Sequence, residues 1–256
     1  MIKIIFTCIL LIHTVHSFSF VVLIDPGHGG KEYGATTMVT RINSKGKSYT
    51  RNLYEKDLTL LLAKKLKKVL QKRFSTYLTR SFDRTVSLEA RADMADTVKA
   101  DVFISIHFNS SFSKNSHGIE TYYLDNHDDK AIKKVEAIEN KSLDGDSKVI
   151  NQILIDLVIQ KTVPSSKKLA TKIHEEVTAK ISDKMQIRDR GIKPGLFYVL
   201  ALSKRPGVLI EAGFMSNSRE VKKISTSKYL SEYANALAKG IIDYHKGLPK
   251  KDLPLF

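Results

Sequence analysis

Four titratable side chains occupy positions where a catalytic site can form. His28 and His107 each follow a run of aliphatic residues that reads as a buried strand, and Glu211 ends a third run of this kind. Glu55 lies where a helix is predicted to begin. Because ligands gather at the carboxyl ends of strands in open α/β sheets, we expect these groups to share one site.

The residue types at these positions suit metal-assisted hydrolysis. Two imidazoles and one carboxylate make a tetrahedral zinc site whose fourth position is open to water. Zinc lowers the pKa of that water and polarises a carbonyl group. A second carboxylate outside the metal shell would take the proton of the water and pass it to the leaving amine.

Each of these residues also has a structural interpretation. A histidine after a strand is often only a hydrogen-bonded structural residue. The spacing of Asn52 and Glu55 resembles a capping box, in which Glu55 would close its own helix. Glu211 is harder to explain in this way, because a buried unpaired carboxylate is costly and functional sites are where that cost is tolerated.

The elements that must position these residues alternate along the chain between strands and helices. Strands are predicted at residues 21–25, 76–79, 102–108, 119–124, 196–200 and 208–211. Helices are predicted at residues 54–72, 88–98, 150–159, 166–181 and 228–244, and residues 44–48 read as a loop excursion. This alternation predicts an α/β fold, with a single sheet covered by helices on both faces.

The chain is predicted to carry an export signal before a single domain. Residues 1–17 combine a positive charge, a short apolar stretch and a small-residue cleavage site, which is the pattern of a signal peptide. Residues 18–256 would then form one catalytic domain. The only cysteine, Cys8, lies within the signal, so His and carboxylate side chains are the metal ligands left to the mature protein.

The formal net charge is +15, and lysines crowd residues 64–73. Such a surface favours polyanions: nucleic acid, anionic lipid headgroups or an acidic envelope polymer. A solvated helix face explains the lysines equally well. We do not expect nucleic acid as a partner, because the chain lacks a basic recognition helix with interleaved aromatic residues and export removes that partner.

A set of motifs in a fixed order resembles the zinc-dependent N-acetylmuramoyl-L-alanine amidases, the peptidoglycan hydrolases of bacterial cell separation. The matching segments are residues 24–30, 55–56, 78–80, 88–91, 101–109, 166–170 and 209–217. Together they span nearly all of residues 21–245. The resemblance implies a mixed, roughly six-stranded sheet flanked by helices.

The resemblance also implies roles for individual residues. One zinc ion would be held by His28, Glu55 and His107. Glu211 would be the catalytic general base. Asn109 and Arg91 also match family positions: Asn109 would support the ligands from behind, and Arg91 would pack or pair beside them. The implied reaction is hydrolysis of the amide between N-acetylmuramic acid and L-alanine in peptidoglycan, by an exported monomer in the periplasm or cell envelope.

Residues 125–162 interrupt the regular alternation and are rich in charge. In self-inhibited members of the family, an inserted helix covers the active site and offers a glutamate to the zinc until a protein activator displaces it. The resemblance therefore implies a regulatory insert here, with Glu139 as the glutamate that occupies the zinc. An ordinary solvated helix is the alternative.

Two other functions are compatible with these residues. A zinc carboxypeptidase or endopeptidase would use the same activated water on another amide of the stem peptide. A non-catalytic wall-binding protein would use the basic surface alone, but it would have no need of the metal-binding and base positions.

Overall fold

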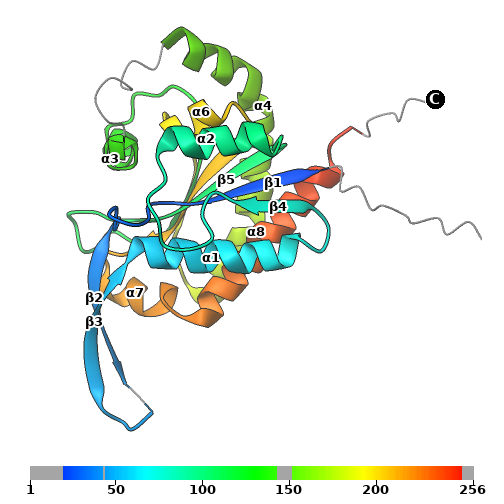
Figure 1. The fold of residues 1–256 in the computed structure, drawn as a ribbon. Helices are drawn as coiled ribbons and strands as arrows, with labels where there is room; N and C mark the ends of the chain where they lie inside the picture. Colours follow the sequence, from blue (N-terminus) through cyan, green and yellow to red (C-terminus); the bar gives the residue numbers. More distant parts are fainter. Residues whose placement is uncertain (1–19, 43, 143–151, 250–256) are drawn as a thin grey trace, which may run out of the picture.

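The computed structural model describes residues 20–42, 44–142 and 152–249, so the predicted signal peptide lies outside the described residues. One six-stranded sheet forms the centre, in the order β4-β1-β5-β8-β6-β7 (Figure 1). Its strands are β1 (Val21–Pro26), β4 (Ser75–Leu78), β5 (Val102–Asn109), β6 (Ile119–Leu124), β7 (Asp189–Gly195) and β8 (Gly207–Phe214). β4, β1, β5 and β8 are parallel, whereas β6 runs antiparallel to β8 and parallel to β7. The mixed sheet confirms the predicted fold class.

Helices cover both faces of the sheet (Figure 1). The α-helices of the described residues are α1 (Glu55–Leu70), α2 (Leu88–Thr97), α3 (Lys130–Glu139), α4 (Gln152–Val177), α5 (Asp183–Met185), α6 (Tyr198–Ser203), α7 (Ser218–Ile224) and α8 (Ser227–Lys246). One core cluster joins alternate sheet residues such as Ile24 to α1, α4 and α8. The sheet residues whose side chains point to the other face, such as Leu23, pack with α2 and α6 in a second cluster. The central strands are buried on both faces, as their continuous apolar runs predict.

A two-stranded hairpin, β2 (Thr36–Ile42) and β3 (Ser48–Tyr54), projects from the body of the molecule beside α1 (Figure 1). Its root is held by Val39 and Leu53, which are buried in the core. The sequence indicated only a loop excursion at residues 44–48, which here lie at and next to the turn of the hairpin. The hairpin leads directly into α1, and so into Glu55.

Two expectations about elements were wrong. Residues 196–200 form no strand: Phe197 is buried and precedes α6, whose side chains cover the sheet. The strand lies upstream as β7, which tolerates Pro194 because it is at the edge of the sheet. In the described residues, the helices expected at residues 150–159 and 166–181 are joined in one helix, α4, which runs from Gln152 through Pro164 to Val177 and is followed by a π-helical turn at Thr178–Ser182. Proline disfavours the interior of a helix. Thr162 and Ser166, on either side of Pro164, are both buried, so the helix stays packed against the protein on both sides of the proline.

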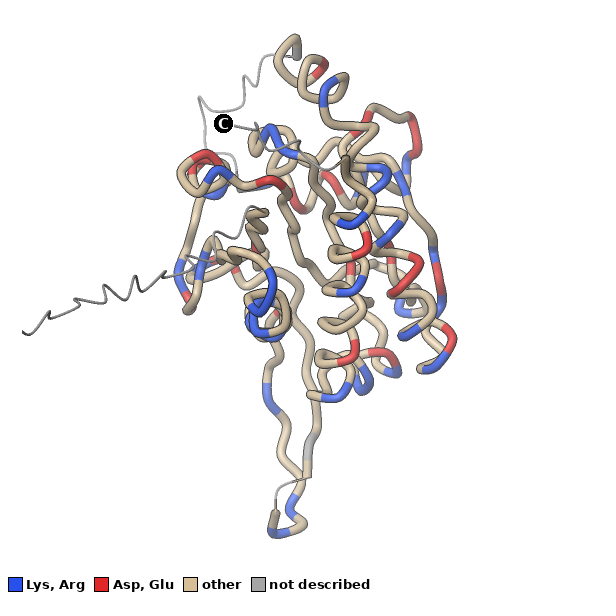
Figure 2. The backbone as a smooth tube through the Cα atoms, turned by 90° about the vertical axis from the view of Figure 1, so that its right-hand side faces the viewer, with Lys and Arg blue, Asp and Glu red and all other residues tan. Residues whose placement is uncertain are grey.

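The basic residues are distributed over several elements. Lys and Arg lie on several helices and near the tip of the hairpin, interspersed with Asp and Glu (Figure 2). On α1, Lys64 and Lys68 are exposed, so the predicted lysine cluster is at least in part a solvated helix face. No helix in the described part of the chain is long and apolar enough to cross a membrane.

Candidate metal centre

The loop after β1 presents His28 in an unusual backbone conformation. His28 has φ 59°, in the left-handed region that non-glycine residues rarely adopt. Gly34 lies against the same side chain, because a Cβ atom there would be 2.6 Å from His28 Cδ2 and 2.5 Å from Glu55 Oε2. A side chain at residue 34 would therefore push the two groups apart.

Two backbone amides orient Glu55 at the start of α1. Its Oε2 accepts a hydrogen bond from the amide of Ala35 at 2.7 Å, and its Oε1 accepts one from Phe108 at 3.0 Å. The capping-box interpretation is wrong, because α1 has Tyr54 as its N-cap and the Asn52 amide instead donates to the Tyr54 hydroxyl. The carboxylate is therefore held toward the histidines.

His107 reaches the same place from the middle of the sheet. β5 lies between β1 and β8, and every residue of β5 is buried. The imidazole packs over Gly27, where a Cβ atom would lie 2.3 Å from His107 Cε1. Only glycine allows the ring this position.

Four side chains converge, each offering one potential ligand atom within 4.8 Å of the others. They are His28, Glu55, His107 and Glu139. Glu55 Oε1 lies 3.1 Å from His28 Nε2 and 3.2 Å from His107 Nδ1. Glu139 Oε2 lies 2.7 Å from the same His107 nitrogen and 3.5 Å from the same His28 nitrogen. The sequence-predicted ligands and the Glu139 carboxylate thus meet at one point.

The polar atoms at this point fit a metal ion. His28 Nε2, His107 Nδ1 and Glu139 Oε2 are buried and have no hydrogen-bond partner of acceptable geometry among the described residues. Buried polar atoms are otherwise nearly always hydrogen-bonded. Two imidazole nitrogens and carboxylate oxygens are the donor set that zinc prefers when thiolates are absent.

The charges within the cluster are strongly coupled. Burial alone lowers the pKa of His107, but the carboxylates of Glu139 and Glu55 outweigh it and hold the pKa well above its usual range. For Glu55, burial acts to raise the pKa, and the two imidazoles overcome it and lower the pKa. In the absence of a bound cation, the carboxylates therefore favour protonated imidazoles.

Glu211 lies next to the cluster on β8. Its Cα position is paired with His107 on β5 and with Glu120 on β6. The residue is fully buried, and neither carboxylate oxygen has a hydrogen-bond partner in the described structure. Burial raises the pKa of Glu211 well above its usual range, and the nearby charge of Glu139 acts in the same direction. A carboxyl group of this kind is suited to accept and return a proton.

Asn109 does not support a ligand side chain. Its amide donates to Glu120 at 2.8 Å. Glu120 also accepts hydrogen bonds from the hydroxyl of Tyr122 and from Arg190 and Lys193. The structure therefore places Asn109 in a buried network around Glu120, which the sequence did not indicate because its members come from three separate strands.

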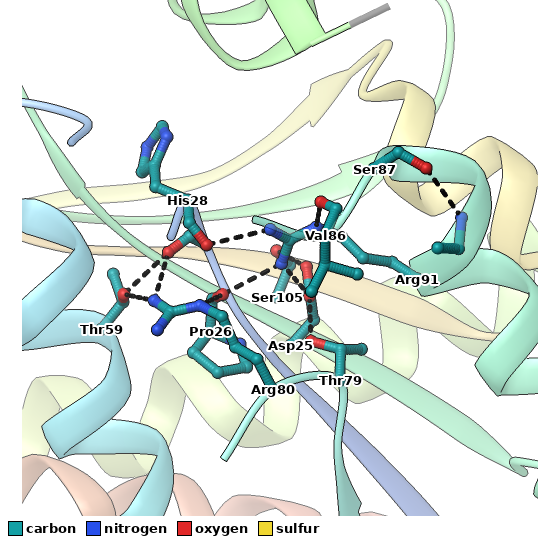
Figure 3. Close-up of polar contacts among 12 residues, drawn as sticks. Asp25, Pro26, His28, Thr59, Thr79, Arg80, Val86, Ser87, Arg91 and Ser105 are labelled. Carbon is teal, nitrogen blue, oxygen red and sulfur yellow. Dashed lines mark hydrogen bonds and ion pairs between the residues drawn. The ribbon is translucent and has the colours of Figure 1, made fainter. Parts of the chain in front are cut away.

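Arg91 holds the loop that carries His28. Its Nη2 donates to the carbonyl oxygen of His28 at 3.0 Å, and its Nη1 pairs with Asp25 Oδ1 at 2.5 Å (Figure 3). Asp25 also accepts hydrogen bonds from the hydroxyls of Thr79 and Ser105. Arg91 therefore acts on the segment of His28 through the backbone, and not through the imidazole.

Replacing Asp25 by Asn should destabilise the protein in a pH-dependent way. Burial acts to raise the pKa of Asp25, but Arg91 and Thr79 overcome it and keep the pKa below its usual value. The ionised pair therefore stabilises the fold above about pH 4, and this contribution is lost as the pH falls through the lowered pKa. At neutral pH, Asp25→Asn leaves Arg91 buried without a counterion, which should cost about 3–5 kcal/mol of unfolding free energy.

Urea unfolding of both proteins at pH 7 and at the lowest pH where the wild type stays folded measures this difference. It should be largest at pH 7 and shrink under acid conditions. Asp243→Asn, which removes a partner of the half-exposed Lys239, is the control and should cost less than about 1 kcal/mol. A difference between wild type and Asp25→Asn that grows on acidification would contradict this account.

The helix α3 carries Glu139 as its last residue and is fastened to the segment before α6. Glu136 accepts a hydrogen bond from the backbone amide of Leu196. Asn140 donates to the Leu196 carbonyl oxygen at 2.9 Å and accepts from the Tyr198 amide at 2.9 Å. Of the predicted insert at residues 125–162, residues 143–151 lie outside the described structure, and the part after them belongs to α4.

An α/β fold in which histidines from β5 and from the loop after β1 meet glutamates at the ends of two helices defines the class of this protein as a candidate metalloenzyme. Residues 22–243 match the family model described as N-acetylmuramoyl-L-alanine amidase. Because this match covers most of the sequence, the chain belongs to the N-acetylmuramoyl-L-alanine amidase family.

Individual relatives agree with this assignment. The chain is 29% identical over 226 residues to N-acetylmuramoyl-L-alanine amidase LytC of Bacillus subtilis, covering 88% of this chain and 35% of that protein. It is 31% identical over 236 residues to the probable amidase AmiB of Haemophilus influenzae, covering 88% of this chain and 52% of that protein. The chain thus spans about half or less of the length of these two relatives.

Solved structures of amidases share the fold. The catalytic domain of CwlV from Paenibacillus polymyxa is 29% identical with a TM-score of 0.64, covering 89% of this chain and 98% of that one. An N-acetylmuramoyl-L-alanine amidase from Clostridium difficile is 30% identical with a TM-score of 0.65, covering 91% and 100% of the two chains. The likeness therefore extends over at least 98% of each solved chain.

Proposed function

We propose that this protein hydrolyses the amide bond between the lactyl group of N-acetylmuramic acid and L-alanine in peptidoglycan, with one zinc ion at the candidate centre. The observation that carries the proposal is the convergence of unpartnered ligand atoms beside the buried Glu211, in a chain of this family. His28, Glu55 and His107 would hold the ion. A bound zinc ion supplies Lewis-acid chemistry, which polarises the scissile carbonyl and makes water a stronger nucleophile.

The residues of the chain supply the proton transfers and the orientation. Glu211 accepts a proton from the attacking water as its oxygen bonds to the carbonyl carbon. The same carboxyl group then gives the proton to the amide nitrogen as the carbon–nitrogen bond breaks. The products are a free lactyl carboxylate on the sugar and a peptide with a free L-alanine amine. The amides of Ala35 and Phe108 keep Glu55 oriented toward the histidines throughout.

Digestion of purified sacculi by the zinc-loaded full chain, with mass analysis of the soluble products, tests this proposal. We expect free stem peptides that begin with L-alanine, and their loss when the enzyme is stripped with a chelator. Release of D-alanine would instead identify a carboxypeptidase, and cut cross-links would identify an endopeptidase. An absence of products, even from a variant lacking residues 125–151, would favour a wall-binding protein.

The proposed site of action is the cell envelope. The family and its relatives are named for an amide bond of peptidoglycan, and one relative in Bacillus anthracis is named a cell wall amidase. The signal pattern predicted for residues 1–17 supports export to the periplasm or cell envelope. We propose that the catalytic unit is a single copy of the chain.

We also propose that α3 holds the enzyme in a self-inhibited state. Glu139 lies within 3.5 Å of ligand nitrogens on both His28 and His107, where it would occupy the open position of the metal. The hydrogen bonds of Glu136 and Asn140 keep it there. A protein activator that displaces α3 is the proposed partner.

Replacing Glu139 by Ala should raise basal activity on sacculi. The substitution removes the carboxylate that competes with water and substrate for the metal, so the gain should reach about 10-fold if that contact is worth at least about 1.4 kcal/mol. Initial rates of dye release from labelled sacculi measure the effect. Lys133→Ala is the matched control on α3, because the Lys133 side chain is 53% exposed and its ion pair within the described residues is with exposed Asp128. Equal activity of wild type and Glu139→Ala would refute self-inhibition by this residue.

A further inference from the structure

Arg80 is a buried cation without a carboxylate in contact. The residue is 1% exposed, and among the described residues it forms no ion pair within 4.0 Å. Asp25, whose charge also acts on Arg80, is paired with Arg91 instead. The Arg80 hydrogen bonds all go to neutral oxygens, and its Nη1 has no partner. This arrangement is expensive, because a buried charge is normally paired.

The neutral oxygens that Arg80 binds belong to the two segments that carry candidate metal ligands. On the loop leading to His28, its Nε donates to the Pro26 carbonyl oxygen at 3.0 Å and its Nη2 to that of Gly27 at 2.8 Å (Figure 3). On the first turn of α1, which begins with Glu55, the same Nη2 donates to the Lys56 carbonyl oxygen at 2.8 Å. One guanidinium group thus connects both segments.

A hydroxyl group completes this connection. Thr59 Oγ1 accepts a hydrogen bond from Arg80 Nη2 at 3.0 Å and donates to the Gly27 carbonyl oxygen at 2.9 Å (Figure 3). Gly27 also lies directly against the imidazole of His107, because a Cβ atom on Gly27 would collide with the ring. A shift of Gly27 would therefore move the surface against which the His107 imidazole packs.

The charge of Arg80 is retained in spite of its burial. Desolvation lowers the pKa of Arg80 only to about 10, so the guanidinium stays protonated at neutral pH. A protonated guanidinium offers several donors in a rigid planar fork, whereas lysine offers donors from a single point. The fork lets Nε hold the Pro26 carbonyl oxygen while Nη2 holds those of Gly27 and Lys56, and a single lysine nitrogen cannot reproduce all of these contacts from two separated points.

We propose that Arg80 is a positioning residue for the metal centre, which fixes the spacing of His28 and Glu55 although none of its hydrogen bonds is to a ligand side chain. Metal affinity then depends on Arg80 beyond its contribution to folding, because a displaced pair of ligands must be brought back together when the ion binds. The inference rests on the proposed function in one respect, namely that these side chains hold a metal.

Metal titration of the folded variants Arg80→Lys and Thr59→Val tests this inference. Zinc dissociation constants come from competition with a chromophoric chelator, and the absorption spectrum of the cobalt-substituted protein reports the ligand geometry. Arg80→Lys should weaken zinc binding at least about 10-fold and alter the cobalt spectrum. Thr59→Val should cause a smaller change in the same direction. Arg205→Lys, which alters a partly exposed pair with Asp96, is the control and should leave both readouts unchanged.

The outcomes separate the role of Arg80 from the metal centre itself. Wild-type zinc affinity and cobalt spectrum in Arg80→Lys, with only a lower melting temperature of the metal-free protein, would overturn the positioning role and leave the metal centre intact. If Arg80→Lys does not fold, Thr59→Val decides, and an unchanged zinc affinity in that variant would overturn the role. Failure of the wild type to bind either metal would refute the metal centre, and the role of Arg80 with it.

Discussion

Glu211→Gln is expected to lower the rate of amide hydrolysis by about 10²- to 10⁴-fold while leaving the metal bound. Glutamine keeps the size and polarity of the side chain, but it cannot accept a proton from the attacking water. The side chain is fully buried beside the ligands and makes no hydrogen bond within the described structure. The substitution therefore removes proton transfer and disturbs little else.

The measurement is the release of stem peptides from sacculi at saturating zinc, together with the metal content of the purified variant. Glu220→Gln is the matched control, because Glu220 is also a buried glutamate but binds the backbone amides of Gly118 and Phe214. That control should keep its activity. An unchanged rate in Glu211→Gln would exclude Glu211 as the base.

His107→Ala is expected to abolish metal binding, and activity with it. The imidazole nitrogen Nδ1 lies 3.2 Å from Glu55 and 2.7 Å from Glu139, so this side chain lies at the centre of the donor set. Its removal would leave one imidazole and carboxylates, a weaker set for zinc than two imidazoles and a carboxylate. Metal analysis after dialysis should fall from one zinc ion per chain to background.

His174→Ala provides the comparison for this variant. His174 is another buried histidine, but its two ring nitrogens contact Thr121 and Asp189. Such a histidine has a structural role, so its replacement should lower stability and leave zinc content at one ion per chain. Loss of zinc in both variants would point to unfolding as the cause and would contradict a specific role for His107.

The candidate ligands could be found in the sequence because each follows an apolar strand run or opens a predicted helix. His28 and His107 follow apolar strand runs, and their strands β1 and β5 pair in parallel, so their carboxyl ends coincide. For Glu211 the strand pattern predicted the shared site, but its position directly beside His107 follows from the pairing of β8 with β5. That pairing depends on the tertiary arrangement, which a strand pattern in one sequence does not specify.

The groups that orient the ligands were not accessible in the same way. Glu55 is held by the backbone amides of Ala35 and Phe108, and every non-proline residue carries such an amide. Arg80 directly follows a short predicted strand, and an arginine at that position does not by itself indicate a role at the site. Its importance depends on being buried without a carboxylate in contact, which only the packed structure shows.

The apolar run at residues 196–200 shows a related difficulty. A short apolar run suits a buried strand and a buried helical segment equally well. Here α6 covers the sheet, and the more polar β7, with Pro194, takes the edge position. Whether residues 196–200 form a strand or a helix therefore depends on the packing of the rest of the chain against the sheet.

The most direct test of the metal centre is anomalous X-ray diffraction from crystals of the zinc-loaded full chain, with data collected on either side of the zinc absorption edge. We expect one anomalous peak among His28, Glu55 and His107, close to Glu139 in the resting protein. The absence of a peak at this position, or a single peak bound by other residues, would contradict the account.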